Sequence, residues 1–382
     1  MFTARWMPVG TASLCAGALL GLAGCNLVDS AFKSETGGSA ETTAKTRIYY
    51  IAADEVDWDY APAGKDLMTG EEFNEEQAVF TVKGPHRIGR VYKKALYREY
   101  TDASFTHLKT RGPEEEHLGL LGPVIRAEVG DVIKVIFKNN SATQTYSMHP
   151  HGVFYDKASE GMPDPMHPES FDGVAAPGAT VNYSWKVPTR AGPGPADGSS
   201  LIWPYHSHVD EPRDINSGLV GAILITAKGK LGSNGRPKDV DREIITLFTI
   251  FDENLSWYLD ENIQRAEDPA GVDPEDPDFQ ESNLKHSING RLYSNLLGLD
   301  MKKGERVRWY LMGMGTEVDI HTPHWHGNTV LIGGHRSDVA ELFPATTQVY
   351  DMVPDDPGMW MYHCHVNDHI VAGMIAMYNV MP

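Results

Sequence analysis

Four His-x-His pairs stand out in this chain of 382 residues. They are His149/His151, His206/His208, His324/His326 and His363/His365. Random placement of the 16 histidines would give only about 0.7 such pairs, so composition does not explain the excess, although chance stays open for any single pair. Residues i and i+2 of a strand point to one side, so each pair would bring two imidazoles together. Eight imidazoles suit several borderline metal ions such as copper, whereas a structural zinc ion is more usually held by four ligands that include thiolates.

Cys364 stands inside the last of these pairs, in the segment MYHCHVNDHIVAGM (361–374). On a strand its thiol would point away from His363 and His365, because successive side chains alternate between faces. One side of the strand could then hold a thiolate-bound metal and the other side two ligands of a separate cluster. We expect the two sites to be joined by only a few covalent bonds, which is a short path for electrons.

Three further residues have the types and spacing to complete a thiolate site. His369 and Met374 follow Cys364 at +5 and +10, and His321 opens the motif HTPHWHG. Two imidazoles, one thiolate and a weak axial thioether are the ligands of a blue-copper electron-transfer site. A lone methionine near a strand is more often core filler, but the spacing here favours a ligand.

The segments that must position these residues occur twice. GDVIKVIFKN (130–139) and GERVRWYLMG (304–313) each precede an HxHG motif and then a W-x-Y-H-x-H motif, and both alternate polar and apolar residues as half-buried strands do. We therefore predict an all-β chain of two β-sandwich domains, residues 46–228 and 242–382. The segment 229–241, rich in glycine and charge, is the predicted linker.

The two copies differ in the residues of the thiolate site. Tyr146 and Ser207 stand in the first copy where His321 and Cys364 stand in the second, and Leu219 matches Met374 if two extra residues are allowed. The four histidine pairs nevertheless remain. This pattern predicts that the first domain supplies ligands to a shared cluster but has no electron entry point; a domain kept only for packing would not explain why the histidines survived.

The charge balance limits the partners. The chain has 33 Lys and Arg against 52 Asp and Glu, a formal net charge of −19. Such a surface repels nucleic acid and anionic lipid and attracts small cations. A solubilising or salt-adapted surface would have the same composition.

The N-terminus has the pattern of an export signal. An uncharged run follows Arg5 and ends in Leu-Ala-Gly-Cys25, which resembles a bacterial lipoprotein box; an ordinary signal peptide cut nearby is the alternative. We expect residues 1–24 to be removed, Cys25 to carry a lipid anchor in the cell envelope facing the periplasm or cell exterior, and residues 25–45 to form a flexible tether. Membrane contact would then be through the anchor alone. Cys364 would be the only thiol of the folded part, so no internal disulfide is expected.

At this point the chain resembles the multicopper oxidases. HPHG, HSH, HTPHWHG and HCHVNDHIVAGM are similar to the four copper motifs of that family. EHLGLLGPVIRAEVGD, FDENLSWYLDENI and ESNLKHSINGRLYSNLLGL resemble the repeat unit of its ceruloplasmin and hephaestin branch. The likeness covers nearly all of residues 46–382 and implies two cupredoxin folds in tandem, each a Greek-key β-sandwich.

The resemblance also implies four copper ions per chain, one of type 1, one of type 2 and two of type 3. The implied ligands are His321, Cys364, His369 and Met374 for type 1; His149 and His324 for type 2; and His151, His206, His208, His326, His363 and His365 for type 3. As in two-domain bacterial oxidases, we expect a homotrimer in which the first domain of one chain and the second domain of its neighbour share each cluster. A cluster within one chain stays open from the sequence.

Ceruloplasmin-like proteins oxidise ferrous iron at acidic sites beside type 1 copper. Glu281, His286 and Asp368 resemble three iron ligands of that site, and Glu317 resembles an acid supplied by a neighbouring unit. Carboxylates favour Fe³⁺ over Fe²⁺, which eases oxidation. The expected function is a ferroxidase that passes electrons from Fe²⁺ through Cys364 and its flanking histidines to the oxygen-reducing cluster.

Three other functions stay open. One is a laccase-like oxidase of phenols or other organic donors, and another is a cuprous oxidase, although the methionines considered for Cu⁺ are scattered (Met148, Met162, Met166, Met312, Met314). The third is a non-catalytic copper-binding module, which the full ligand set disfavours. Asp156 is a candidate proton relay because it lies near HPHG.

Overall fold

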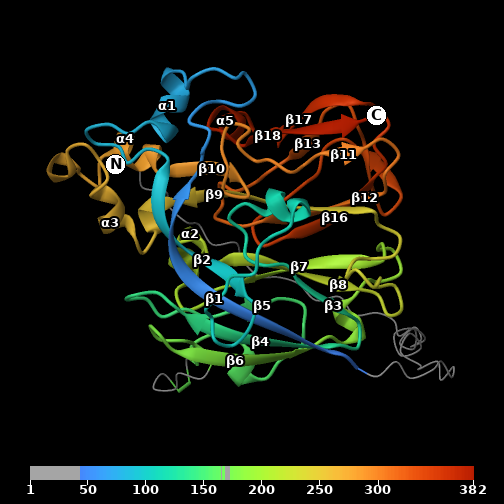
Figure 1. The fold of residues 1–382 in the computed structure, drawn as a ribbon. Coiled ribbons are helices and arrows are strands. Elements are labelled where there is room, and N and C mark those ends of the chain that lie inside the picture. The colour runs from blue at the N-terminus through green and yellow to red at the C-terminus, as the bar shows by residue number, and fades with distance from the viewer. Residues whose placement is uncertain (1–43, 165, 168–172) are drawn as a thin grey trace, which may run out of the picture. The chain divides into compact units, whose positions relative to one another are not determined.

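The computed structural model describes residues 44–164, 166–167 and 173–382 (Figure 1). The expected signal segment, the anchor residue Cys25 and all but the last two residues of the expected tether lie outside this part of the chain. None of the helices in the described ranges combines the length and the apolar character that a membrane crossing requires.

The N-terminal half forms two four-stranded sheets. The first has the strand order β2-β1-β4-β6 and the second the order β3-β8-β7-β5. Their strands are β1 (Thr46–Asp59), β2 (Val91–Tyr100), β3 (Ile125–Glu128), β4 (Val132–Asn139), β5 (His149–Pro150), β6 (Thr180–Lys186), β7 (Ser200–His206) and β8 (Val220–Thr226).

The C-terminal half repeats this arrangement in two sheets of its own, with the orders β10-β9-β12-β16-β14-β15 and β11-β18-β17-β13. The strands are β9 (Arg242–Asp252), β10 (Leu284–Ile288), β11 (Met301–Lys302), β12 (Val307–Gly313), β13 (Pro323–Trp325), β14 (Val330–Ile332), β15 (His335–Ser337), β16 (Thr347–Met352), β17 (Gly358–Cys364) and β18 (Ile375–Met381).

The internal repeat is visible in the directions of the strands. β1 runs parallel to β4 as β9 runs parallel to β12, and β3 runs parallel to β8 as β11 runs parallel to β18. The histidine-bearing pairs β5–β7 and β13–β17 are both antiparallel. The prediction of two cupredoxin-like β-sandwiches in tandem is confirmed, and both segments predicted to open a copy contain a strand, β4 and β12.

Each sandwich has its own core, and a third core lies between the halves. β12 contributes to two of them, since Trp309 and Leu311 pack inside the C-terminal sandwich whereas Tyr310 and Met312 face the shared core. That dual contact explains why every residue of β12 is buried. β4, in contrast, keeps the alternation expected of a half-covered strand, with Lys134 exposed.

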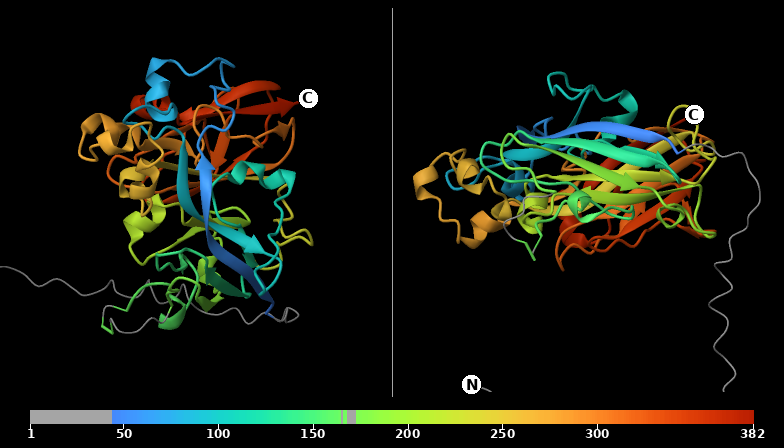
Figure 2. Two further views of the ribbon diagram at one scale, coloured as in Figure 1. Left: turned by 60° about the vertical axis from the view of Figure 1, so that its left-hand side comes forward. Right: turned by 90° about the horizontal axis from the view of Figure 1, so that it is seen from below.

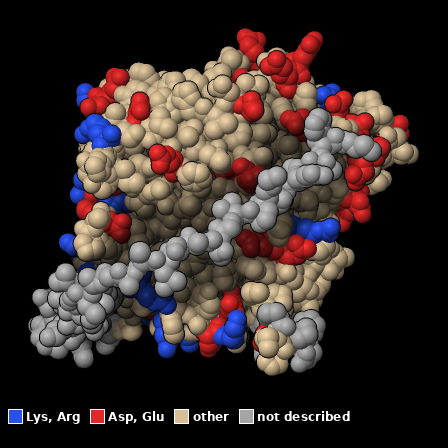
Figure 3. All heavy atoms as spheres, turned by 180° about the vertical axis from the view of Figure 1, so that it is seen from behind, with Lys and Arg blue, Asp and Glu red and all other residues tan. Residues whose placement is uncertain are grey.

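The helices are short and lie outside the sheets: α1 (Glu75–Thr81), α2 (Glu211–Asn216), α3 (Leu259–Ile263), α4 (Pro277–Ser282) and α5 (Asn367–Val371). The segment with α3 and α4 projects beyond the sheets (Figure 2). In the rear view, acidic side chains gather along one edge (Figure 3), as the net charge of −19 leads one to expect.

Candidate metal centres

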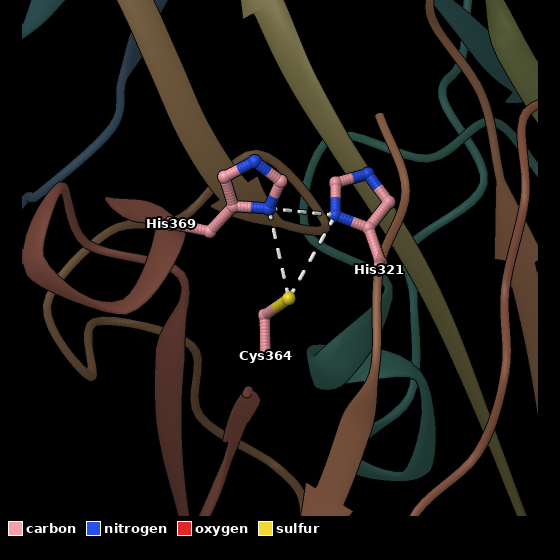
Figure 4. A group of neighbouring side chains, drawn as sticks. All are labelled: His321, Cys364 and His369. Atoms are coloured by element: carbon pink, nitrogen blue, oxygen red, sulfur yellow. Dashed lines mark hydrogen bonds between the residues drawn. The ribbon is translucent and has the colours of Figure 1, made fainter. Parts of the chain in front are cut away.

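A buried thiolate site lies where the loop before β13, the end of β17 and helix α5 meet. His321, Cys364 and His369 point toward one another there (Figure 4). Cys364 Sγ is 3.9 Å from His321 Nδ1 and 3.6 Å from His369 Nδ1, and the two nitrogens are 3.2 Å apart. The donor set and its convergence fit a trigonal copper ion, for which a cysteine and two histidines are the typical ligands.

Asp319 fixes the orientation of His321 in this site. Its carboxylate oxygen Oδ1 lies 3.2 Å from His321 Nε2 and also accepts a hydrogen bond from the Ile250 amide at 2.7 Å, while Oδ2 accepts one from the Thr316 amide at 2.9 Å. Asp319 is only 2 % exposed. Because a carboxylate accepts from Nε2–H, it leaves Nδ1 as the nitrogen that faces the sulfur, which is the role of a second-shell carboxylate at metal sites.

The protonation of Cys364 suits metal binding. Burial raises the pKa of its thiol, but the contacts of the sulfur with His321, His369 and the Thr322 amide outweigh burial and lower the pKa to about 6. The site therefore holds a thiolate near neutral pH, the form that binds metals.

Met374 is fully buried beside the same residues. Its backbone amide donates to the His369 carbonyl at 2.9 Å, and its carbonyl accepts from the Cys364 amide at 3.1 Å. These two bonds tie the predicted axial ligand to two of its three predicted partners.

The first half has the same backbone frame with different side chains. The Leu219 amide donates to the Asp214 carbonyl at 3.1 Å, and the Ser207 amide donates to the Leu219 carbonyl at 3.2 Å. Ser207, Asp214 and Leu219 therefore occupy the places that Cys364, His369 and Met374 occupy in the second half. The sequence comparison had matched two of these three, and Asp214 completes the set.

In the first half, hydrogen bonds that include Trp257 and Tyr258 of the second half stand in the place of a thiolate site. Ser207 Oγ donates to Asp214 Oδ2 at 2.6 Å, and Trp257 Nε1 donates to Asp214 Oδ1 at 2.9 Å. Tyr146, in the place of His321, has its hydroxyl 3.1 Å from that of Tyr258. Two hydroxyls and a carboxylate that already accepts several hydrogen bonds do not make a thiolate copper site.

Behind Cys364, on the other face of β17, lies a group of imidazoles. The ligand nitrogens of His324, His326 and His363 lie within 4.8 Å of one another. His326 Nε2 is 3.0 Å from His363 Nε2, and the ring of His365 is 5.5 Å from that of His363. Only the first member of each pair lies on a strand and the second follows its end, yet the rings of each pair remain adjacent, as predicted from the i, i+2 spacing.

Backbone carbonyls set the tautomers of this group. His363 Nδ1 lies 2.7 Å from the Cys364 carbonyl and His324 Nδ1 lies 2.9 Å from the Asp338 carbonyl. A carbonyl only accepts, so Nδ1 carries the proton and Nε2 offers its lone pair to the cluster. Burial, followed by the neighbouring imidazoles, lowers the pKa of His363 to about 4, which keeps the ring neutral and able to bind a metal.

The first half presents a matching group. His151 Nε2 is 3.0 Å from His206 Nε2, and the ring of His149 is 5.0 Å from that of His208. His149 Nδ1 and His206 Nδ1 lie 2.7 and 3.0 Å from the carbonyls of Glu160 and Ser207. Burial lowers the pKa of both His151 and His206 to about 4, with neighbouring imidazoles adding to the effect.

The two imidazole groups come from different halves of the chain. Among the described residues, no set of three ligand atoms within 4.8 Å joins a histidine of the first half to one of the second. The chain carries two groups of four imidazoles, which we call half-sites, and among the described residues three ligand atoms lie within 4.8 Å of one another only in the second of them.

The residues predicted to bind iron lie around the thiolate site but do not converge. The ring of His286, on β10, is 5.2 Å from that of His369, and its buried Nδ1 has no hydrogen-bond partner in the described part of the chain. Burial, followed by the nearby His369, lowers its pKa to about 3. Glu281, Asp368 and Glu317 are exposed, and the 4.8 Å criterion does not gather them with His286 among the described residues.

Sequence reasoning missed two residues, Asp319 and Asp214. Asp319 stands two positions before His321, in EVDIH, and two positions after Glu317. Its polar character in a segment that leads into a buried ligand was the available signal. The signal for Asp214 was weaker, because two extra residues in the first copy hide its match to His369.

Comparison with known proteins bears on the same residues. Residues 118–230 and 267–382 each match a family described as multicopper oxidase, and together these segments make up more than half of the chain. The first contains all four paired histidines of the first half, and the second contains the thiolate site and the other four paired histidines.

Curated relatives extend the likeness to most of the chain. It is 47% identical over 347 residues to Ferroxidase HEPHL1 of Mus musculus, 46% over 343 residues to ceruloplasmin of Homo sapiens and 45% over 342 residues to hephaestin of Homo sapiens. These alignments cover 87–88% of this chain but only 28–31% of the relatives, so the chain spans less than a third of their length.

Solved structures share the fold. One described as a multicopper oxidase superposes with a TM-score of 0.56 at 18% identity and covers 88% of this chain and 89% of its own. Multicopper oxidase mgLAC gives a TM-score of 0.56 at 19% identity, with 88% and 86% covered.

Proposed function

The chain belongs to the multicopper oxidase family, and from that premise we propose that it is a ferroxidase that couples the oxidation of Fe²⁺ to the reduction of O₂. The balanced reaction takes four Fe²⁺, one O₂ and four protons to four Fe³⁺ and two waters. Copper is the cofactor that the family implies, and when bound it supplies one-electron transfer and oxygen reduction.

The protein would hold copper with the residues described above. In this proposal His321, Cys364, His369 and Met374 hold one ion, and the eight histidines of the two half-sites hold three. Cys364 is joined through the backbone to His363 and His365, so the chain itself links the thiolate site to the half-site behind it. The thiolate lies on the opposite face of β17 from the imidazoles, which keeps it away from oxidants at the cluster.

The observation that carries the choice of iron is the contact of His286 with His369. The ring centroids of His286 and His369 are 5.2 Å apart. A substrate ion held at His286 would therefore be separated from a residue of the thiolate site by this one contact between rings. Asp368, next to His369 in the sequence, and Glu281 on α4 would supply hard oxygen ligands that stabilise Fe³⁺ over Fe²⁺. Their exposure lets them capture iron from solvent, with Glu317 assisting from a neighbouring chain.

The test compares two electron donors in a double variant. Glu281→Gln with Asp368→Asn removes the two exposed acids and keeps His286, whose loss would leave a cavity beside His369. We expect kcat/KM for Fe²⁺ to fall about tenfold or more, because contacts with charged groups are worth about 1.5–3 kcal/mol each. Oxidation of a bulky phenylenediamine should keep its kcat/KM.

Glu275→Gln with Asp278→Asn is the matched control. Both residues are exposed acids in the α4 region, so the control loses the same total charge, at positions on or near the helix that carries Glu281. An equal loss with both donors, or the same loss of iron oxidation in the control, would contradict the iron assignment.

We also propose that the cluster forms between chains in a homotrimer. The separation of the two half-sites supports this arrangement, since a head-to-tail contact closed by threefold rotation would bring unlike half-sites together. Mixing a His149→Ala/His151→Ala chain with a His324→Ala/His326→Ala chain tests it. Shared clusters predict that the mixture regains oxidase activity while neither chain alone has any; inactivity of the refolded mixture would contradict it.

The N-terminus completes the proposal. Residues 1–24 would direct export, and lipid on Cys25 would hold the enzyme at the cell envelope. Incorporation of labelled palmitate that is lost in Cys25→Ser is the measurement, and equal labelling of both chains would exclude the anchor.

A further inference from the structure

The outer face of the β17–β18 pair carries a row of methionines that ends at the imidazole half-site. In β17 the even-numbered Tyr362 and Cys364 belong to the sandwich core, so the odd-numbered residues face away from it. In β18 the even-numbered Ala376 and Tyr378 belong to the same core. Met359 and Met361 of β17 and Met377 of β18 therefore share the outward face.

The register of the sheet brings these thioethers together. Met361 is paired directly with Met377, and Met359 precedes Met361 on the same face. Side chains of directly paired residues start about 4.5–5.5 Å apart at Cβ, within reach of a common ligand for flexible methionines. Met359 is 61% exposed, and Met361 and Met377 are half-buried, so solvent can reach the group.

The same row continues into the half-site. On the other side of β17 the His326 amide donates to the Met361 carbonyl at 3.0 Å, which places His326 across from Met361. The next outward residue of β17 is His363, paired with His324. Met361 thus lies between Met377 and His326, at the edge of the group whose nitrogens lie within 4.8 Å.

We propose that Met359, Met361 and Met377 form a binding site for Cu⁺ and pass the ion to the imidazoles of His326 and His363. Thioethers are soft ligands that select Cu⁺ over Cu²⁺ and over hard ions such as Fe²⁺. The transfer exchanges thioether for imidazole ligands and involves no change in oxidation state. Met381, on the same face, is paired with Lys302, and a cation there disfavours a metal ion, so it is left outside the site.

The binding experiment uses the copper-loaded full chain and Ag⁺, a stand-in for Cu⁺ that does not change oxidation state. We expect one additional Ag⁺ per chain, measured by equilibrium dialysis, with shifts of the methionine methyl resonances. The triple variant Met359→Leu/Met361→Leu/Met377→Leu should bind this ion at least about tenfold more weakly. Leucine matches methionine in volume and polarity, so the fold should be kept.

Met68→Leu/Met166→Leu is the matched control, because both methionines are exposed and lie on other segments. It should keep the additional Ag⁺. The proposal is overturned if the native chain takes up no additional Ag⁺, if the triple variant binds it unchanged, or if the control loses it equally. Loss of chain assembly with unchanged Ag⁺ binding would show instead that the methionines are an interface.

The transfer step rests on the proposed copper centres and has its own measurement. Metal-free chain given Cu⁺ from a competing chelator in aerated buffer should develop oxidase activity, and the Cys364 blue absorption once dissolved O₂ has oxidised the bound Cu⁺ to Cu²⁺, several-fold faster than the triple variant. With excess Cu²⁺ both chains should reach the same final absorption. Equal rates from Cu⁺ would overturn the transfer, whereas absent absorption from Cu²⁺ would overturn the copper centres themselves.

Discussion

Replacing Asp319 by asparagine tests whether a buried carboxylate organises the thiolate site. The change keeps the size of the side chain and removes its charge. An asparagine oxygen in the place of Oδ1 can still accept from Ile250, but the amide group in the place of Oδ2 faces the Thr316 amide, so two donors meet there. The alternative rotamer instead breaks the contacts with Ile250 and His321.

Two independent figures give the expected size of the effect. Hydrogen bonds to a charged group are worth about 1.5–3 kcal/mol, and loss of a second-shell partner typically lowers metal affinity about 10–100-fold. Since tenfold corresponds to about 1.4 kcal/mol, the two ranges agree. We expect Asp319→Asn to bind copper at the Cys364 site about 10–100-fold more weakly, as measured by competition with a chelator while the thiolate-to-copper absorption is monitored.

Glu341→Gln is the matched control for this change. Glu341 is exposed and adjoins Leu342, whose backbone pairs with that of His321, so its loss removes one negative charge nearby without removing a bond to the imidazole. The control should keep the native affinity. If Asp319→Asn also kept it, the idea that this carboxylate sets the orientation of His321 would be refuted.

Three further outcomes are expected. Cys364→Ser should abolish the blue absorption and turnover with both Fe²⁺ and organic donors, and residual blue colour would place the thiolate site elsewhere. Lys94→Met should lower the free energy of unfolding by about 3–5 kcal/mol at pH 7 in a urea titration, because it leaves the fully buried Glu253 without its ion-pair partner. This loss of stability should shrink as the solution is acidified, since Glu253 then takes up a proton. A loss that does not depend on pH would contradict this cause. In the metal-free chain, burial holds the pKa of His151, His206 and His363 near 4, below the usual 6.5, so the unfolded state binds more protons than the folded state between these two values. The free energy of unfolding should therefore fall as the pH is lowered from about 6.5 to 4, by at most about 1.4 kcal/mol per pH unit for each ring. Constant stability across this window would show that the rings are not buried as neutral bases.

The sequence was sufficient wherever chemistry depended on local spacing. The alternation of side chains along a strand predicted that Cys364 and its flanking histidines face apart, and the repeated motifs predicted two copies of one sandwich. His321 and His369 converge on Cys364. These predictions succeeded because the residues concerned lie close together in sequence or in a repeated frame.

The sequence alone does not predict contacts between distant segments. Asp319 is fixed by an amide of β9, and His286 of β10 reaches His369 of α5, so neither role is visible without the tertiary fold. The methionines of β17 and β18 were overlooked for the same reason. Met361 and Met377 are far apart in sequence terms, with the whole thiolate motif between them, and only the pairing of the two strands makes them neighbours.

The two halves together show what the cluster requires of each domain. Both keep four imidazoles, of which one pair approaches to 3.0 Å between Nε2 atoms and two rings have Nδ1 held by a backbone carbonyl. Only the second half keeps the thiolate, while the first fills the same backbone frame with Ser207 and Asp214. Hydrogen bonds between side chains can thus take the place of a metal ion in holding this backbone frame together. They are sufficient because buried donors and acceptors require only a hydrogen-bond partner. The carbonyls that orient the imidazoles belong to the backbone, so their positions do not depend on which side chains fill the neighbouring frame.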